Sequence, residues 1–231
     1  MEVAKTLKNC YIIVMLEMKA YYPKSDSTLV AVQEKTEQTC ALPMIDLQFG
    51  GGCNFRCIYC DTPNYDTPNN LDVEAISRIM KSGNTDFLFI CGLGEPSAQE
   101  TGNMDKFKYL LGVAKENGVH VSAFSNLYNW DNEIFDHVDA GTLNVLHKLD
   151  SFNIDRIKYL YGLEKVHGRN ADKVARKYLN NVEVLKEIAM NKHNDQTNVG
   201  ASIVLTNVNL DEREKLLGHG GGEYFQIIWR A

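Results

Sequence analysis

Three cysteines stand close together in the stretch GGGCNFRCIYCDTPN, residues 50–64. Cys53, Cys57 and Cys60 form a CxxxCxxC pattern, and thiolates at this short spacing can each hold one corner of an iron–sulfur cube. The glycines before them let the backbone adopt conformations that side chains forbid. Three thiolates leave one iron of a four-iron cube without a protein ligand, and an open metal position is where chemistry takes place.

Other interpretations of the same cysteines stay open. A zinc site would need a fourth ligand from Cys40, Cys91 or one of the six histidines, but no second CxxC is present to form the paired knuckles typical of zinc sites. A purely electron-transferring cluster would normally take a fourth cysteine. The alternative from a different functional class is therefore a non-catalytic iron–sulfur or zinc-binding protein.

Apolar runs and amphipathic stretches alternate along the chain from residue 44 onward. The run at 86–92 is continuous and apolar, as is typical of a buried parallel strand. Strands are predicted at 44–49, 86–92, 119–125, 142–150, 198–206 and 224–230, and helices at 71–83, 104–118, 131–141, 173–190 and 210–217. This alternation implies parallel pairing with right-handed crossovers. The sequence therefore predicts an α/β fold, a partial (βα)6 TIM-type barrel open on one side, with ligands at the carboxyl ends of the strands.

The chain divides into two parts by this pattern. Residues 1–43 are expected to form an N-terminal lead-in with a small β-hairpin, and residues 44–231 the barrel core. The net charge of −6 disfavours a nucleic-acid-binding surface, and no apolar run approaches the length of a membrane span. Six irregularly spaced cysteines indicate metal or redox chemistry in a reducing compartment, so we expect a cytoplasmic protein.

The string CNFRCIYC resembles the signature of the radical S-adenosylmethionine (SAM) enzymes: Cys, three residues, Cys, one residue, an aromatic, Cys. The resemblance implies two cofactors, a [4Fe-4S] cluster held by Cys53, Cys57 and Cys60, and SAM, whose amino and carboxylate groups chelate the fourth iron. The reduced cluster would cleave SAM to a 5′-deoxyadenosyl radical, which abstracts hydrogen from a substrate. Tyr59 matches the position whose backbone contacts the adenine.

Two further strand ends resemble cofactor-binding positions of that family. The string CGLGEPS (91–97) resembles the GGEP motif, with Leu93 in place of the first glycine, and the resemblance implies that Gly94 and Glu95 hold the SAM amine. Ser125 and Asn126 end the next strand and resemble polar groups that face the cofactor. A helix cap or an Asx turn explains the latter pair equally well.

The later strand ends are expected to complete the cofactor site. Asp150 and Ser151 follow one strand and are candidates to bind ribose hydroxyls. Asn207 follows the next strand in a group with Thr206 and Asn209, and this group resembles a site that contacts the ribose or a carboxylate. The strings KLDS (148–151) and YLYG (159–162) resemble the branches related to the molybdenum-cofactor cyclase and to peptide-modifying enzymes. The cysteine-rich C-terminal extension that carries auxiliary clusters in many relatives is not found in this sequence.

The resemblance implies an enzyme, with a small molecule or a peptide as substrate and an electron donor such as flavodoxin or ferredoxin as partner. The short length also resembles activases that install a glycyl radical on a protein partner, so this alternative stays open. Membranes and nucleic acids are not expected partners.

Overall fold

Six parallel strands form one sheet in which each strand pairs with the next along the chain, in the order β1-β2-β3-β4-β5-β6. The computed structural model describes residues 44–50, 52–60, 71–92, 94–191, 198–219 and 225–229. Parallel strands in sequential order, joined by helical crossovers, are the connectivity of an open TIM-type barrel, so the predicted fold class is confirmed. The lead-in of residues 1–43 lies outside the described residues, and its hairpin stays a prediction.

The elements match the predicted ranges to within a few residues. The strands are β1 (Met44–Leu47), β2 (Phe87–Ile90), β3 (His120–Ser125), β4 (Leu143–Lys148), β5 (Val199–Leu205) and β6 (Phe225–Trp229). The helices are α1 (Val73–Lys81), α2 (Asn103–Asn117), α3 (Asn132–Asp139), α4 (Ile154–Leu160), α5 (Leu163–His167), α6 (Ala171–Asn191) and α7 (Arg213–His219), with short 3-10 turns η2 (Gln99–Thr101), η3 (Gly168–Asn170) and η4 (Leu210–Glu212).

Two differences from the predicted elements matter for the site. The short helices α4 and α5 were not among the predicted ranges, and α5 has five residues, too few to show a helical period. Asn153 caps α4 by accepting hydrogen bonds from the first backbone N–H groups, and Gly162 starts α5 in the left-handed conformation.

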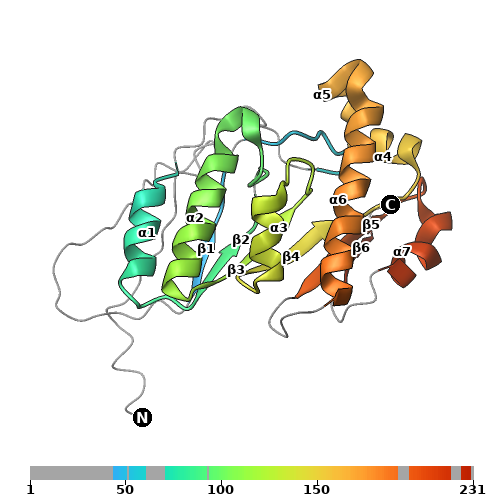
Figure 1. Cartoon of the computed structure of the whole chain (residues 1–231). Helices are drawn as coiled ribbons and strands as arrows, with labels where there is room; N and C mark the ends of the chain where they lie inside the picture. Colours follow the sequence, from blue (N-terminus) through green and yellow to red (C-terminus); the bar gives the residue numbers. More distant parts are fainter. Residues whose placement is uncertain are drawn as a thin grey trace, which may run out of the picture.

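One face of the sheet is covered by helices. Figure 1 shows α1, α2, α3 and α6 side by side in front of the sheet, with α4 and α5 above the upper end of β4. Leu143 and Val145 of β4 belong to the same buried core as Ile134 and Val138 of α3, whereas alternate residues of β4 are only half-buried. The strands therefore present a packed face to the helices and a more open face on the other side.

Local signals explain where several helices begin. Asp72 caps α1 by accepting from the Ala75 N–H at 3.0 Å, and Asp131 caps α3 by accepting from the Ile134 N–H. Across the described helices, none has both the length and the apolar character that a membrane span requires.

Candidate active site

The three cysteines of the CxxxCxxC pattern lie on the loop that follows β1, which we call the cysteine loop (residues 50–60). Cys53 and Cys57 are half-buried, Cys60 is exposed, and all three are free thiols. The Cys60 N–H donates to the Cys57 carbonyl at 3.0 Å and closes a turn at residues 58–59. The predicted ligand set is therefore presented by one folded loop.

The backbone at the start of the cysteine loop packs directly against the backbone of the turn that follows β2. The Glu95 N–H donates to the Gly52 carbonyl at 2.7 Å. Gly94 has a φ of +85°, and a Cβ atom there would lie 2.3 Å from the carbonyl oxygen of Gly50. A Cβ atom on Gly52 would lie 2.1 Å from the Thr101 side chain. The two motifs recognised in the sequence thus touch directly, at a contact that admits only glycine.

Glu95 holds the ends of β2 and β3 together. Its carboxylate is buried and accepts from the Ser97 N–H at 3.1 Å, the Ser97 hydroxyl at 2.6 Å, the Ser125 hydroxyl at 2.7 Å and the Asn126 N–H at 2.7 Å. Burial raises the pKa of Glu95, and these four donors act in the opposite direction without cancelling it. The side chain predicted to bind the SAM amine therefore already has four protein donors, and its role toward SAM stays a prediction.

Asn126 connects the end of β3 to the first cysteine. Its Nδ2 donates to Asn54 Oδ1 at 2.7 Å and lies 4.0 Å from the Cys53 sulfur. Its Oδ1 accepts from the Tyr128 N–H at 3.1 Å, which is the Asx turn that the sequence left open. The Nδ2 of Asn54 is buried and has no hydrogen-bond partner among the described residues. A buried N–H donor beside a cysteine fits a sulfur-rich cluster, because hydrogen bonds to the sulfurs stabilise their charge.

Tyr59 ties the cysteine loop to the end of β4. Its hydroxyl donates to Asp150 Oδ2, and the other oxygen of Asp150 accepts from the Val204 N–H at 2.6 Å. The Lys148 ammonium lies 3.6 Å from Asp150 Oδ2 and 4.2 Å from the centre of the Tyr59 ring. Burial, together with the Asp150 charge, raises the pKa of Tyr59. Asp150 is completely buried, so its predicted contact with ribose remains untested.

The segment that runs from the last residue of α4 to the end of α5, residues 160–167, holds the middle of the cysteine loop; we call it the clamp segment. The Arg56 N–H donates to the Tyr161 carbonyl and the Ile58 N–H to the Leu160 carbonyl, both at 2.9 Å. The Phe55 ring stacks on the Tyr161 ring with centroids 5.2 Å apart. These contacts fix the backbone on both sides of Cys57.

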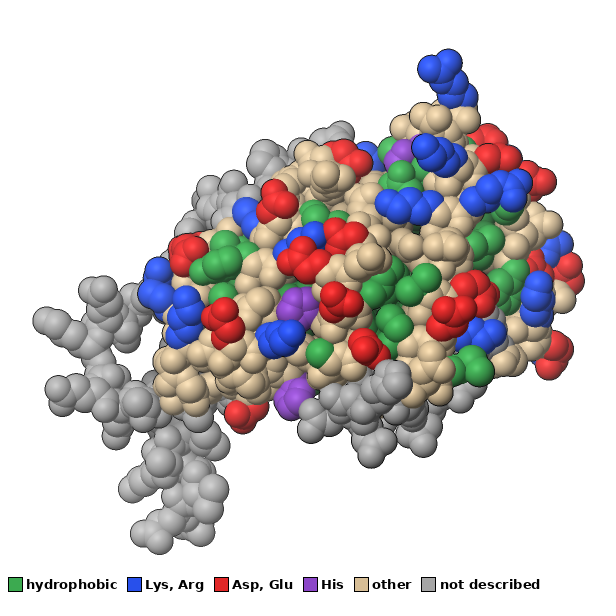
Figure 2. Space-filling view, viewed as in Figure 1, with side chains coloured by type: hydrophobic (Ala, Val, Ile, Leu, Met, Phe, Trp, Pro, Cys, Tyr) green, Lys and Arg blue, Asp and Glu red, His purple; other side chains and the backbone are tan. Residues whose placement is uncertain are grey.

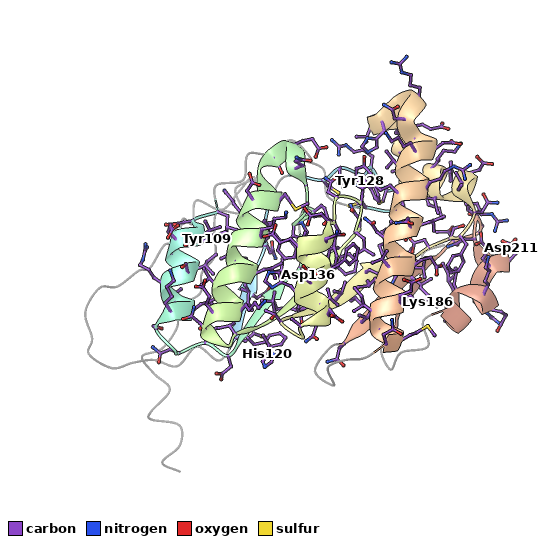
Figure 3. All side chains as sticks on the ribbon, viewed as in Figure 1. Tyr109, His120, Tyr128, Asp136, Lys186 and Asp211 are labelled. Carbon is purple, nitrogen blue, oxygen red and sulfur yellow. The ribbon has the colours of Figure 1, made fainter. Side chains whose placement is uncertain are left out.

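Two more residues of the clamp segment reach the cysteine loop. Gly162 has a φ of +59°, and a Cβ atom there would lie 2.1 Å from the Arg56 carbonyl oxygen. His167 Nε2 lies 2.8 Å from the Asn54 carbonyl oxygen, and its ring contacts Tyr128, which Figure 3 labels beside the upper part of α6. Sequence reasoning missed the clamp; its one signal is the glycine of the YLYG string.

The remaining predicted residues lie at the ends of β4 and β5. The Ser151 hydroxyl is buried and donates to Glu212 Oε1 at 2.7 Å. Asn209 Nδ2 donates to the Asp150 carbonyl at 2.6 Å and thereby joins the two strand ends. Asn207 is exposed. Ser151 and Asn209 thus brace the loops that border the site, and the predicted ribose contacts of Ser151 and Asn207 stay predictions.

The donor set fits a cluster better than a single metal ion. Burial raises the pKa of Cys53 and raises that of Cys57 to about 12, although the Lys148 charge lowers the latter. Metal binding must therefore displace protons from these thiols. Within the described ranges, no three His, Cys, Asp or Glu side chains lie close enough together to hold one metal ion. An iron–sulfur cube instead takes each thiolate at a separate corner.

Comparison with known proteins agrees with this geometry. The family model described as "Radical SAM superfamily" matches residues 47–219, which is more than half of the chain. No match was found among curated proteins.

Three solved structures with the same fold were determined with bound molecules. Streptococcus suis SuiB bound to S-adenosylmethionine has a TM-score of 0.59 and 13% identity, over 82% of this chain and 41% of SuiB. Native anSMEcpe with bound AdoMet and the Cp18Cys peptide has a TM-score of 0.54 and 17% identity, over 81% of this chain and 51% of the other. TYW1 with a lysine-pyruvate adduct bound has a TM-score of 0.52 and 14% identity, over 82% of this chain and 65% of TYW1. The match with this chain thus covers between 41% and 65% of the length of these three proteins.

Proposed function

Because the chain belongs to the radical SAM superfamily, whose enzymes use a [4Fe-4S] cluster and SAM, we propose that it cleaves SAM reductively and abstracts hydrogen from a substrate through a 5′-deoxyadenosyl radical. The observation that carries the proposal is the cysteine loop, which presents three free thiols and is held by the ends of β2, β3 and β4 and by the clamp segment. When bound, the cluster supplies the electron that breaks the sulfonium bond of SAM.

The chain's own residues orient these groups. Cys53, Cys57 and Cys60 would hold three irons and leave the fourth for SAM. We propose that Glu95 and the neighbouring backbone of Gly94 hold the SAM amine, with the Glu95 carboxylate fixed in place by the four hydrogen bonds that it accepts. That carboxylate fixes the turn, so the polar backbone groups need no reorganisation when the SAM amine arrives.

The other strand ends would complete the SAM site. The backbone of Tyr59 would contact the adenine, and its hydroxyl anchors the loop on Asp150. Asn126, together with Ser125, would face the cofactor from the end of β3. Asp150, Ser151 and Asn207 would lie along the ribose; these assignments rest on the family resemblance.

A peptide or a small molecule is the proposed substrate. Support comes from two proteins of the same fold, SuiB solved with its precursor peptide and anSMEcpe solved with a peptide. An electron donor such as flavodoxin or ferredoxin would supply the electron, and the free thiols suit a reducing compartment such as the cytoplasm. No observation favours a glycyl-radical partner over these substrates.

A pair of cysteine variants tests the proposal. Wild-type chain reconstituted anaerobically with iron and sulfide should hold about four irons, and with SAM and dithionite it should release 5′-deoxyadenosine, measured by chromatography. Cys57→Ala should lose both the iron and the product. Cys91→Ala, which removes a thiol outside the motif, should keep both. Product formation by Cys57→Ala at the wild-type level would refute the ligand assignment.

A further inference from the structure

Positive charge gathers on one part of this acidic chain. Residues 163–177, which comprise α5, η3 and the first turns of α6, carry five basic and two acidic residues, a net charge of +3 with His neutral, whereas the whole chain carries −6. Figure 2 shows Lys and Arg side chains grouped at the top of the molecule, over α5 and the adjoining end of α6. We call the exposed residues Lys165, Arg169, Lys173 and Lys177 the basic surface.

The members of the basic surface form no ion pairs with the described acids around them. The two carboxylates of the same stretch lie instead near Lys158, Asp172 at 2.7 Å and Glu164 at 3.9 Å, and a third carboxylate, Asp155, shares that ammonium at 2.9 Å. Adding Lys158 and Asp155 to the count leaves the net charge at +3. No ion pair between described residues involves a member of the basic surface. An uncompensated patch of this kind attracts an oppositely charged partner and accelerates its association.

The basic surface lies next to the cysteine loop. Lys177 Nζ lies 4.9 Å from the centre of the Tyr128 ring, and that ring is 6.0 Å from the Phe55 ring of the cysteine loop. His167, between Lys165 and Arg169 in the chain, places its Nε2 2.8 Å from the Asn54 carbonyl. Asn54 follows Cys53 in the chain, so this contact joins helix α5, which carries Lys165, to the backbone beside a predicted cluster ligand.

Exposed apolar side chains accompany these charges. Ile58 of the cysteine loop, Tyr159 of α4 and Val166 of α5 are all exposed. The backbone of Ile58 lies beside the end of α4, because the Ile58 N–H donates to the carbonyl of Leu160, the residue after Tyr159. Transient protein–protein interfaces combine apolar side chains with a polar rim.

We propose that the basic surface docks an acidic protein electron carrier of low potential, of the flavodoxin or ferredoxin class. This inference rests on the proposed function, since only a cluster-bearing chain needs such a partner. The carrier is oxidised by one electron, the [4Fe-4S] cluster is reduced by one, and no proton or other group is transferred.

An acidic peptide substrate would be a different occupant of the same charges. The position of the basic surface favours the carrier, because α6 lies on the helix-covered face of the sheet while the strands have their more open face on the other side. The basic surface is also linked to the loop that carries the thiols through the Tyr128 ring, which lies between Lys177 and Phe55, and that loop is where an electron must enter.

The test compares two triple charge reversals of equal size in the reconstituted holoenzyme. One variant, Lys165→Glu/Arg169→Glu/Lys173→Glu, reverses three of the four charges of the basic surface. It keeps the contact between Lys177 and the Tyr128 ring. The matched control, Arg78→Glu/Lys81→Glu/Lys115→Glu, reverses exposed cations on α1 and at the end of α2. Photoreduced flavodoxin is mixed anaerobically with each protein plus SAM, and bleaching of the cluster absorbance gives the rate of reduction. Circular dichroism confirms that both variants are folded.

The basic-surface variant should be reduced roughly 10-fold more slowly than wild type at 50 mM salt, and the control within about 2-fold, since electrostatic steering contributes a factor of this order. The difference should vanish near 1 M salt, where the Debye length is about 3 Å. Dithionite should reduce all three proteins equally. Equal rates with flavodoxin would overturn the docking proposal, and the patch would then serve another partner. A wild-type chain that binds no cluster would instead overturn the proposed function.

Discussion

Replacing Gly162 with alanine tests whether the clamp segment positions the cysteine loop. At φ +59° an L-residue is strained, and the new Cβ atom would lie 2.1 Å from the Arg56 carbonyl oxygen. That oxygen belongs to the cysteine loop backbone, which cannot move without disturbing the hydrogen bonds from Arg56 and Ile58 to the clamp segment. The substitution should therefore weaken the loop that holds Cys57.

The expected magnitude follows from these contacts. The left-handed conformation costs a non-glycine residue about 1–2 kcal/mol, and two lost hydrogen bonds add about 0.5–1.5 kcal/mol each. The total destabilisation is about 2–5 kcal/mol. Gly118 provides the matched control, because its φ is +68° and a Cβ atom there would meet nothing within 4 Å. Gly118→Ala should cost the backbone strain alone, about 1–2 kcal/mol.

Two measurements compare these variants. In thermal unfolding of the cluster-free chain, Gly162→Ala should melt roughly 2–12 °C below Gly118→Ala, because the two variants differ by about 1–3 kcal/mol of lost hydrogen bonds and a chain of this size loses about 2–4 °C per kcal/mol. After reconstitution, Gly162→Ala should retain less iron per chain than Gly118→Ala. If both variants melt together and bind the same amount of iron, the clamp segment does not position the cysteine loop.

Two further substitutions address the braces around the site. Tyr59→Phe removes the donor to the buried Asp150 carboxylate and should lower the free energy of unfolding by about 1–3 kcal/mol, measured with urea; an unchanged midpoint would show that the bond contributes nothing. For Glu212, burial acts to raise the pKa, but hydrogen bonds from a backbone N–H, a serine and an arginine outweigh it and lower the pKa. A lowered carboxyl pKa stabilises the fold above the unfolded pKa and this contribution fades as the pH falls through the folded value. Glu212→Gln should therefore cost about 1–2 kcal/mol at pH 7 and progressively less below pH 4.5, and a pH-independent difference would contradict this.

The fold could be predicted because its strands have clear patterns in the sequence. The run at 86–92 is continuously apolar, and the regular alternation of predicted strands and helices left few possible sheet topologies. The five-residue helix α5 escaped detection because it is shorter than two helical turns. The clamp segment escaped for a different reason: its bonds to the cysteine loop join backbone groups far apart in the chain, and backbone partners leave no side-chain pattern.

The site was predictable in its residue types and less so in its contacts. The spacing of the cysteines predicted one loop of ligands, and the structure places them on one loop. Sequence placed Glu95 and Asp150 at strand ends, where acids could meet a ligand. It could not show that both carboxylates accept hydrogen bonds from the protein, since those donors come from other strands. Which partners a buried acid finds depends on register, and register is fixed only by the assembled sheet.

Electron paramagnetic resonance of the reduced, reconstituted chain tests the central claim most directly. If Cys53, Cys57 and Cys60 leave one iron open for SAM, the reduced cluster should give a [4Fe-4S] signal whose g-values shift when SAM is added. A cluster whose spectrum is identical with and without saturating SAM would have no iron available to that ligand, and the account of the cysteine loop as a radical SAM centre would be wrong.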